Sequence, residues 1–322
     1  MAIPEPWRPL RVLVTGASGF VGYAVARRFA EVGHEVHGLT RRASGLPPGI
    51  ERVAGDLLDG GSIRKAVGQV EPEVVCHLAA AVRVRESRTD PVRYWQTNVG
   101  GTLSLLEALA EARPGSRLIL ASTCAVYGEP ARQPITEDAR SEPINPYGAG
   151  KLAADRAAAD LAATGAIGAV SLRSFNVAGG LPGHPDRDEA RLIPKVVAVA
   201  QGRAQELVVN GDGTTVRDYV HVLDMADAFL AAVEVCVRGA WQAYNVGGGG
   251  RTRIVDVIAT TERLTGKPLA VRHQPAAAEP PVMTADSTKF QQATGWSARR
   301  SGLDQIIGDA LEAGRTGYPP GE

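Results

Sequence analysis

Cysteine is scarce in this sequence, charge is balanced and no long apolar segment occurs. The three cysteines, Cys76, Cys124 and Cys236, are odd in number and widely spaced, which fits reduced thiols better than a disulfide framework or a zinc site. We therefore expect no bound metal. No stretch approaches the length needed to cross a bilayer, and residues 1–10 lack the apolar core of a signal peptide. These absences predict a cytoplasmic protein that does not enter a membrane.

The charge balance also limits the partners. The 35 basic residues offset 35 acidic residues, so no overall field attracts the protein to nucleic acid or to an anionic membrane. An anionic ligand must instead be held by local groups. The hydrophobic share of 44% over 322 residues is enough to bury a sizeable core, which predicts a packed globular enzyme.

The first forty residues have the pattern of strand, tight turn, helix and strand. A β-rich run at 11–15 is followed by the sequence GASGFVG, and apolar residues then recur at helical spacing until Gly33 ends the pattern. A second apolar run, at 36–39, supplies the next strand. Two parallel strands joined through a helix form a right-handed βαβ unit.

The alternation of strands and helices continues to about residue 176. Further strands are predicted at 74–80, 117–122 and 169–175, and helices at 99–112 and 152–163. This order predicts an α/β protein built on a Rossmann-type, doubly wound parallel sheet.

The regularity fails after Asn176, where the sequence GGLPG at 179–183 is a cluster of helix and strand breakers. The change predicts two structural units. We expect a dinucleotide-binding domain formed by residues 1–177 together with about 217–246. Residues 178–216 and 247–315 are expected to form a smaller C-terminal α/β lobe that binds the substrate over the open end of the sheet.

Three glycines lie where the first strand becomes a helix. Gly16, Gly19 and Gly22 allow a tight turn, a close approach of the backbone to a pyrophosphate and close packing of helix on strand. The N-terminus of the helix favours the negative charge of that pyrophosphate. A glycine triplet alone also fits an ordinary βα turn, but here strand, turn, helix and second strand occur in the order that dinucleotide binding requires.

The residues after the second strand bear on the choice of cofactor. NAD enzymes often have an acidic residue here that binds the ribose hydroxyls, whereas this chain has Thr40, Arg41 and Arg42. Two guanidinium groups can bind a 2′-phosphate, which slightly favours NADP, although a solvated basic loop is the alternative. Asp56, after the third apolar run, is predicted to bind the adenine amino group or else to cap the next helix.

Tyr147 and Lys151 are four residues apart in the sequence YGAGK. That spacing places both on one face of a helix, so that an ammonium lies near the phenol, favours its ionised form and lowers its pKa from about 10. Such a tyrosine can act as a general base near neutral pH. Pairs of this kind also occur by chance on solvated helices. Here, however, the strand ending at Ser122 and Thr123 precedes the pair, and a hydroxyl there can bind the same substrate oxygen.

Taken in order, these motifs resemble the extended short-chain dehydrogenase/reductase family, in its NAD-dependent epimerase/dehydratase branch. Within that branch the sequence is most similar to the nucleotide-sugar epimerases typified by UDP-galactose (UDP-glucose) 4-epimerase. The resemblance extends from about residue 11 to residue 313. The matching segments are TGASGFVG, HLAA at 77–80, NVGGT at 98–102, AVYG at 125–128, YGAGK, LRSFNVAG at 172–179, LIPKV at 192–196 and GDGTTVRDYVHV at 211–222.

The resemblance implies a role for each matching residue. Tyr147 is the implied base, Lys151 binds the nicotinamide ribose, and Thr123 supplies the hydroxyl partner. The other residues implied to bind the cofactor are Phe20, Val21, Leu57, Leu78, Ala79, Ala80 and Asn98. Those implied to face the sugar nucleotide, together with Thr123, are Asn176, Arg191, Leu192 and Arg217.

Arg217 also has a rationale that is independent of the resemblance. A guanidinium matches the geometry of a phosphate, and a protein without net charge needs such a local anchor. The alternative is a surface ion pair with Asp218 or Asp224.

Several positions depart from the pattern of the family. Cys124 and Ala125 stand where the 4,6-dehydratases have an acid pair, so elimination of water by that route is not expected. Ser174 replaces a tyrosine before Phe-Asn. Ala276 replaces an arginine that would give a second contact to phosphate.

The loop that follows the HLAA segment also departs from the pattern of the family. Val82 stands where the epimerases often have a lysine against the cofactor, with Arg83 or Arg85 available as a replacement. Near the site, Cys124 is interpreted as a packed side chain rather than a catalytic thiol. His221 is interpreted as a structural histidine.

The sequence therefore predicts a nucleotide-sugar 4-epimerase of the UDP-hexose type, with NAD(P) tightly bound and regenerated in each turnover. An NADPH-dependent 4-keto reductase of a deoxy sugar nucleotide would use the same residues, and a cofactor-binding regulator without catalysis is a more remote alternative. Members of the family commonly pair through two helices, so the resemblance implies a homodimer. The candidate helices are the alanine-rich helix after Lys151 and the helix with Leu103, Leu106 and Leu109.

Overall fold

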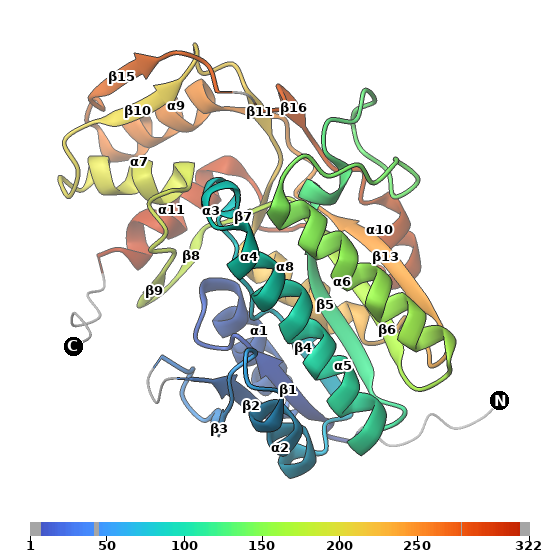
Figure 1. The fold of residues 1–322 in the computed structure, drawn as a ribbon. Helices are drawn as coiled ribbons and strands as arrows, with labels where there is room; N and C mark the ends of the chain where they lie inside the picture. The colour runs from blue at the N-terminus through green and yellow to red at the C-terminus, as the bar shows by residue number, and fades with distance from the viewer. Residues whose placement is uncertain (1–7, 42–44, 278, 316–322) are drawn as a thin grey trace.

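The computed structural model describes residues 8–41, 45–277 and 279–315 and contains the predicted parallel sheet (Figure 1). Seven strands follow the order β13-β6-β5-β4-β1-β2-β3, and every neighbouring pair in this order is parallel. The doubly wound, Rossmann-type sheet is thereby confirmed. The strands are β1 (Arg11–Thr15), β2 (Glu35–Thr40), β3 (Glu51–Ala54), β4 (Val74–His77), β5 (Arg117–Thr123), β6 (Gly168–Ser174) and β13 (Trp241–Val246).

Helices cover both faces of the sheet because the strands are apolar on both faces. Helices α1 (Phe20–Glu31) and α8 (Val222–Ala232) pack on one face, where Phe29 and Phe229 are fully buried. Helices α2 (Gly60–Val70), α5 (Gly101–Ala112) and α6 (Pro146–Ala163) pack on the other. Two separate apolar clusters, one on each face, therefore stabilise the same strands.

The helical stretch before α5 begins earlier than the sequence pattern predicts. The short helices α3 (Val84–Thr89) and α4 (Pro91–Tyr94) precede a π-helical turn, η1 (Trp95–Gly100), that leads directly into α5. A π-helical turn inserts an extra residue into the helix and is frequent at functional sites. Here it forms the wall of the sheet's open end, next to the loop that follows β4.

Two of the three leucines that mark α5, the candidate dimer helix, face the interior of the chain. Leu106 is 5% exposed and Leu109 is fully buried, because both pack against the sheet within the same chain. Leu103, which is 49% exposed, lies outside that core.

A smaller lobe covers the open end of the sheet, as predicted, and lies at the top of Figure 1. Its core includes the fully buried Leu207, Val257, Ile306 and Ile307. Its helices are α7 (Leu192–Ala200), α9 (Ile254–Thr265) and α11 (Leu303–Ala313). Its short strands are β8 (Gly180–Leu181), β9 (His184–Pro185), β10 (Leu207–Asn210), β11 (Val216–Arg217), β14 (Thr252–Arg253), β15 (Val271–Gln274) and β16 (Val282–Met283). Strands β7 (Asn176–Ala178) and β12 (Tyr219–His221) pair with each other beneath it.

One part of the expected domain boundary is wrong. Residues 288–296, which include α10 (Thr288–Thr294), pack on the dinucleotide-binding domain and not on the lobe. Phe290 contacts Tyr244 of β13 and Trp296, with ring centroids 5.2 and 5.4 Å apart. The aromatic cluster draws this segment back to the edge of the sheet. Within the described part of the chain, none of the helices is both long and apolar enough to span a membrane.

Candidate functional site

The main cavity, of about 1480 Å³, extends along the carboxyl ends of the strands and under the lobe. Strands β1 and β4 are neighbours there while their following helices pack on opposite faces, which is the position where ligands bind in open α/β sheets. Nine basic side chains and five acidic ones line the cavity. The cleft is therefore positive although the whole chain is neutral, which meets the expectation that anions are held locally.

The glycine turn forms one wall of this cavity. Gly16 has φ +72°, and a Cβ there would lie 2.8 Å from the Ala79 nitrogen; a Cβ on Gly22 would lie 2.1 Å from the Gly16 oxygen. Helix α1 begins after Gly19 without a side-chain cap, so its first amides keep their capacity to bind an anion. The turn thus fits the pyrophosphate of a dinucleotide.

A buried set of polar side chains fixes the turn after β4. The Thr15 hydroxyl accepts hydrogen bonds from the backbone nitrogens of Leu78 and Ala79, both at 3.1 Å. His77 lies 2.7 Å from Thr15 and 3.1 Å from Thr102, and burial lowers the pKa of His77 to about 3, so its ring is neutral. Thr15, His77 and Thr102 were not predicted as part of the site. They hold the Leu78–Ala79 backbone against the glycine turn.

Asn98 does not line the cavity as expected. Its amide oxygen accepts from the Ala81 nitrogen at 2.8 Å and its amide nitrogen donates to the Ala81 oxygen at 2.9 Å. Both ends of the buried side chain are therefore occupied by the loop after β4. Asn98 shapes the cavity by holding this loop, not by pointing into it.

Arg41, Asp56 and Leu57, which were predicted to bind the cofactor, also line the cavity. Arg41 is 71% exposed on its side chain and lies 3.9 Å from the Asp56 carboxylate. Asp56 does not cap the next helix: Asp59 does, accepting from Gly61 and Ser62 at 3.0 and 3.2 Å. The predicted Arg42 lies outside the described residues.

A segment of the lobe also covers the glycine turn. The ring of His184 stacks on Tyr23 of α1, with centroids 3.9 Å apart and planes 12° apart. Burial lowers the pKa of His184, against the effect of the Gly19 backbone carbonyl, which accepts a hydrogen bond from the ring. In the sequence, the sign of this segment was the cluster of helix and strand breakers, GGLPG at 179–183, that precedes His184. The contact ties the lobe to the wall of the cofactor cleft.

Tyr147, Lys151 and Thr123 all line the cavity, as expected. Helix α6 begins at Pro146, where Asn145 accepts from the Gly148 nitrogen at 2.8 Å, so Tyr147 and Lys151 lie on successive turns. Thr123 is the last residue of β5, and its side chain hydrogen-bonds Tyr147. The Lys151 ammonium donates to the Ala121 carbonyl at 2.9 Å.

The protein alone does not lower the pKa of Tyr147, contrary to our expectation. Burial raises the pKa of Tyr147 to about 12, against the hydrogen bond from Thr123 and the charge of Arg191. Burial also lowers the pKa of Lys151 to about 8, which the Asp155 carboxylate opposes. Desolvation of both groups outweighs their mutual proximity.

Behind this pair lies a buried polar network that the sequence did not reveal. The Asp155 carboxylate accepts from Ser122 at 3.0 Å and from Arg173 at 3.2 Å. Arg173 also donates to the Tyr127 hydroxyl at 3.1 Å, and Tyr127 donates to Asn245 at 2.7 Å. The only available sign was an acidic residue one helical turn after Lys151. The network fixes β5, β6 and α6 to one another beneath the site.

Arg217 lines the lobe side of the cavity but does not make the ion pair considered as its alternative. It pairs with Glu279 at 2.7 Å, not with Asp218 or Asp224. Asp218 is buried and accepts from backbone nitrogens, while Asp224 pairs with Arg300 at 3.0 Å. Arg217 therefore keeps its place at the cavity wall, together with Asn176 and Leu192.

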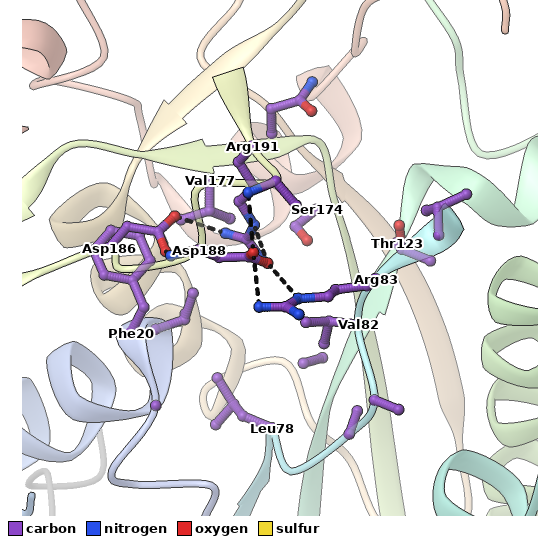
Figure 2. Close-up of a pocket in the computed structure, with 18 of the residues that line it drawn as sticks. Phe20, Leu78, Val82, Arg83, Thr123, Ser174, Val177, Asp186, Asp188 and Arg191 are labelled. Carbon is purple, nitrogen blue, oxygen red and sulfur yellow. Dashed lines mark hydrogen bonds and ion pairs between the residues drawn. The ribbon is translucent and has the colours of Figure 1, made fainter. Parts of the chain in front are cut away.

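Four charged residues meet across the mouth of the cleft (Figure 2). Arg83, from the loop after β4, contacts Asp188 of the lobe at 3.1 and 3.3 Å. Arg191, just before α7, donates to Asp186 at 3.1 Å and lies 3.9 Å from Asp188. We call Arg83, Asp186, Asp188 and Arg191 the cross-cleft cluster. Only Arg191 among them was predicted as a substrate-binding residue.

Two further residues near the site have structural surroundings. Burial raises the pKa of the Cys124 thiol to about 11, so it stays protonated and is a poor nucleophile at neutral pH. His221 begins α8, where its Nδ1 accepts from Leu223 at 3.1 Å, and its Nε2 lies 3.1 Å from Asp309. Burial lowers the pKa of His221, in keeping with a structural role.

Comparison with known proteins agrees with this site. A UDP-glucose 4-epimerase of Streptomyces lividans is 40% identical over 94% of this chain and 95% of its own length. The crystal structure of UDP-glucose 4-epimerase from Brucella ovis in complex with NAD is 36% identical, has a TM-score of 0.88 and covers 95% of this chain and 98% of that one. MoeE5, solved with UDP-glucuronic acid and NAD, is 32% identical with a TM-score of 0.84, covering 94% of this chain and 98% of its own. Residues 12–247 match the family model described as NAD dependent epimerase/dehydratase, and the chain belongs to that family.

Proposed function

We propose that this protein is a UDP-hexose 4-epimerase, which inverts carbon 4 of the sugar through a transient 4-keto intermediate. One observation carries the proposal: Tyr147 and Thr123 share a single cavity with the glycine turn at one end and Arg217 at the other. That arrangement provides a proton acceptor between a dinucleotide site and a phosphate anchor. The UDP-glucose 4-epimerases that match most of the chain support the same function.

The residues of the cleft fit a nicotinamide dinucleotide. The first amides of α1 would bind its pyrophosphate, and Arg41, Asp56 and Leu57 would line its adenosine end. Lys151 would bind the nicotinamide ribose, as the resemblance implies. A dinucleotide bound there supplies one chemical capacity, the reversible acceptance of a hydride from carbon 4. Everything else in the reaction is done by side chains of the protein.

Tyr147 moves the proton in this mechanism. Its phenol oxygen accepts the proton of the sugar 4-hydroxyl and later returns it, while Thr123 hydrogen-bonds and orients the reacting groups. Because burial raises the pKa of Tyr147 to about 12, the base needs positive charge close to it. The charge of Arg191 acts on the phenol in this sense, and Lys151 is the cation one turn further along α6.

The intermediate must turn over between the two half-reactions, and the walls of the cavity give it room. Cys124, Ala125 and Ser174 are small residues that line the cavity near Tyr147. Ser174 stands where the family usually has a tyrosine, so it widens the sugar site. Arg217 holds the diphosphate during the rotation, so that the keto sugar stays bound.

Replacement of Tyr147 by Phe tests this function. The variant should lose at least about a hundredfold in turnover of UDP-glucose to UDP-galactose, the lower end of the range for general acid–base catalysis. It should still retain the dinucleotide, because the phenol hydroxyl is not needed for the pyrophosphate turn. Product formation is followed by chromatography of the UDP-sugars. Stoichiometric accumulation of reduced coenzyme during steady turnover would contradict an epimerase and favour the 4-keto reductase.

We extend the proposal to the identity of the dinucleotide, which is NADP. The support is local: β2 ends at Thr40, which has no carboxylate for the ribose hydroxyls, and the exposed Arg41 follows it. Denaturing the purified protein and identifying the released nucleotide tests this point. NADP is expected from the wild type, with a lower share of NADP from the Arg41→Ala variant; NAD from the wild type would refute it.

We also propose that the protein forms a homodimer through α6 and the helical stretch that ends in α5. Trp95, Val99 and Leu103 follow one another at four-residue spacing, and Trp95 and Leu103 are 44% and 49% exposed. Light scattering at micromolar concentration should give a dimer for the wild type and a monomer for Leu103→Lys. The control is Val237→Lys, which changes an exposed apolar residue elsewhere on the surface and should leave the dimer intact.

A further inference from the structure

The segment 184–188 of the lobe contacts both walls of the cofactor cleft. At one end, the ring of His184 stacks on Tyr23 of α1, with centroids 3.9 Å apart and planes 12° apart. At the other end, Asp188 pairs with Arg83 at 3.1 and 3.3 Å (Figure 2). We call residues 184–188 the strap. Helix α1 follows β1 and the Arg83 loop follows β4, so the strap joins the ends of two neighbouring strands, between which dinucleotides bind in sheets of this type.

The strap is an ordered part of the fold. It continues the hairpin of β8 and β9, in which Leu181 pairs with His184. Leu181 is 1% exposed and packs in the apolar cluster on the α1 face of the sheet. A Cβ on Gly180 would lie 2.6 Å from a side chain of α11, so the hairpin also fits closely against the lobe. Further along, the Asp186 side chain accepts a hydrogen bond from the Asp188 nitrogen at 3.0 Å. The hairpin thus presents the two ends of the strap to the two walls.

The contacts at the two ends are of a kind that can break and re-form. Arg83 is 55% exposed on its side chain, and an exposed ion pair contributes little to stability. At the other end, one aromatic stack is supported by a hydrogen bond from the His184 ring to the Gly19 carbonyl. Both ends line the same cavity as the glycine turn. The strap can therefore close this part of the cleft and still open to admit a ligand.

We propose that the strap retains the dinucleotide from one turnover to the next, and that His184 and Asp188 close it over the cleft. A 4-epimerase must return the hydride to the sugar that gave it, so a dinucleotide lost in its reduced form would leave the keto sugar unreduced. The proposal rests on the 4-epimerase function and deepens it. His184 and Asp188 are positioning residues: neither moves a proton or a hydride, and both act on the rate at which the dinucleotide leaves.

Release of the bound dinucleotide tests the proposal. The protein is loaded with isotope-labelled NAD or NADP, whichever the purified wild type releases on denaturation, and the loss of label is followed in excess unlabelled nucleotide. His184→Leu should speed release by about 3- to 10-fold, through loss of the stack. Asp188→Asn should speed it by about 2- to 5-fold, through loss of the ion pair. The double variant should reach about 6- to 50-fold, because both contacts oppose the same opening step.

The kinetic constants distinguish retention from damage to the reacting site. With saturating NAD or NADP added, kcat of each variant for UDP-glucose should stay within about twofold of the wild type. Without added nucleotide, the activity of the double variant should fall on dilution, whereas the activity of the wild type should not.

Two rescue variants test the contacts themselves. His184→Phe keeps a ring to stack on Tyr23 and loses both ring nitrogens, so it should retain the dinucleotide better than His184→Leu. The pair Arg83→Asp with Asp188→Arg restores an ion pair of reversed direction, so it should release the dinucleotide more slowly than Asp188→Arg alone. Fast release from the reversed pair would contradict the proposal, because Arg83 would then act on the dinucleotide directly.

Two matched controls lie in the lobe outside the cavity. His273→Ala removes a histidine whose ring is hydrogen-bonded to a glycine carbonyl, that of Gly211, at 2.7 Å. Arg263→Gln removes an arginine that pairs with an aspartate, Asp304. Both variants should release the dinucleotide at the wild-type rate.

The results separate the strap from the 4-epimerase function. Release at the wild-type rate from the double variant would overturn the strap and leave the 4-epimerase function intact. A large fall in kcat at saturating dinucleotide would also overturn it, because the two residues would then shape the reacting site. If the wild type retained its dinucleotide but did not epimerise UDP-glucose, the 4-epimerase function would be refuted, and with it the reason for the strap.

Discussion

At the scale of single residues, the burial of Lys151 has the largest energetic consequence. The side chain is 4% exposed, and its one hydrogen bond is to the Ala121 carbonyl. Asp155 stands one helical turn away, but its carboxylate is directed to Ser122 and Arg173. A buried ammonium with so few partners is expensive in water-excluded surroundings. In the proposed function, this cation serves the phenol and the cofactor.

This cost can be measured as a dependence of stability on pH. The pKa of Lys151 is about 8 in the folded protein against an ordinary value of 10.5, so between these values the unfolded chain binds the extra proton. The free energy of unfolding of the wild type therefore rises with pH in that window. Lys151→Met should be more stable than the wild type at neutral pH, by up to about 3 kcal/mol, while losing activity.

Urea denaturation across the same range checks the prediction. The advantage of Lys151→Met should shrink as pH rises from 8 to 10.5, because the wild-type lysine is neutral in both states above that range. A stability difference that stays constant over the window would mean that Lys151 is not desolvated in the folded protein.

At the scale of secondary-structure elements, the junction of β1 and α1 depends on one glycine more than on any side chain. A Cβ at Gly22 would lie 2.1 Å from the Gly16 oxygen, closer than any real contact, so the turn and the helix must move apart. Because the amides at that junction form the proposed pyrophosphate site, separation should remove the anion site before it unfolds the domain.

Gly22→Ala should therefore abolish retention of the dinucleotide and lower stability, whereas Gly68→Ala provides the matched control. Gly68 lies in the interior of α2 with no atom within 4 Å of an added Cβ. Alanine there should stabilise the protein by about 0.5–1 kcal/mol through helix propensity, without effect on the cofactor. Thermal unfolding and absorbance of the bound nucleotide report both effects. Normal cofactor content in Gly22→Ala would contradict this prediction, because it would show that the turn accommodates the added Cβ and still binds the dinucleotide.

At the scale of the whole molecule, the cleft is built from both structural units, so its ligands should couple them. The glycine turn and Tyr147 belong to the dinucleotide-binding domain, and Arg217 belongs to the lobe. Without ligands, the described contacts across the mouth include the Arg83–Asp188 ion pair and the stacking of His184 on Tyr23. Exposed ion pairs contribute little, typically below about 1 kcal/mol.

Bound UDP should consequently stabilise the protein well beyond what those contacts provide. At a concentration of about 100 times its dissociation constant, a ligand that binds only the folded state adds about 2.7 kcal/mol. Thermal unfolding with and without UDP measures this, and Arg217→Ala should remove most of the shift. If UDP stabilised Arg217→Ala as much as the wild type, the diphosphate would have to bind elsewhere in the cleft.

The parts of the fold that the sequence predicted depend on local relations. The glycine turn, the spacing of Tyr147 and Lys151 and the order of strands and helices follow from neighbouring residues along the chain. Features that the sequence did not reveal depend on more distant partners. Leu106 and Leu109 are buried because the sheet lies beneath them, and Asn98 binds Ala81 across seventeen positions.

By itself, the sequence determined the doubly wound sheet and the placement of Tyr147 and Lys151 on successive turns of one helix, because strand and helix periodicity and the Tyr-Lys spacing are set by covalent distance. Only the tertiary structure decided the charges around them. The charge of Arg191, from the lobe, acts on Tyr147, from the domain with the sheet, only because the two units fold together. The pKa values of Tyr147 and Lys151 follow from burial that no local pattern encodes. The strength of an electrostatic interaction at close range depends on which groups are excluded from water, and the packing of the whole fold decides which groups those are.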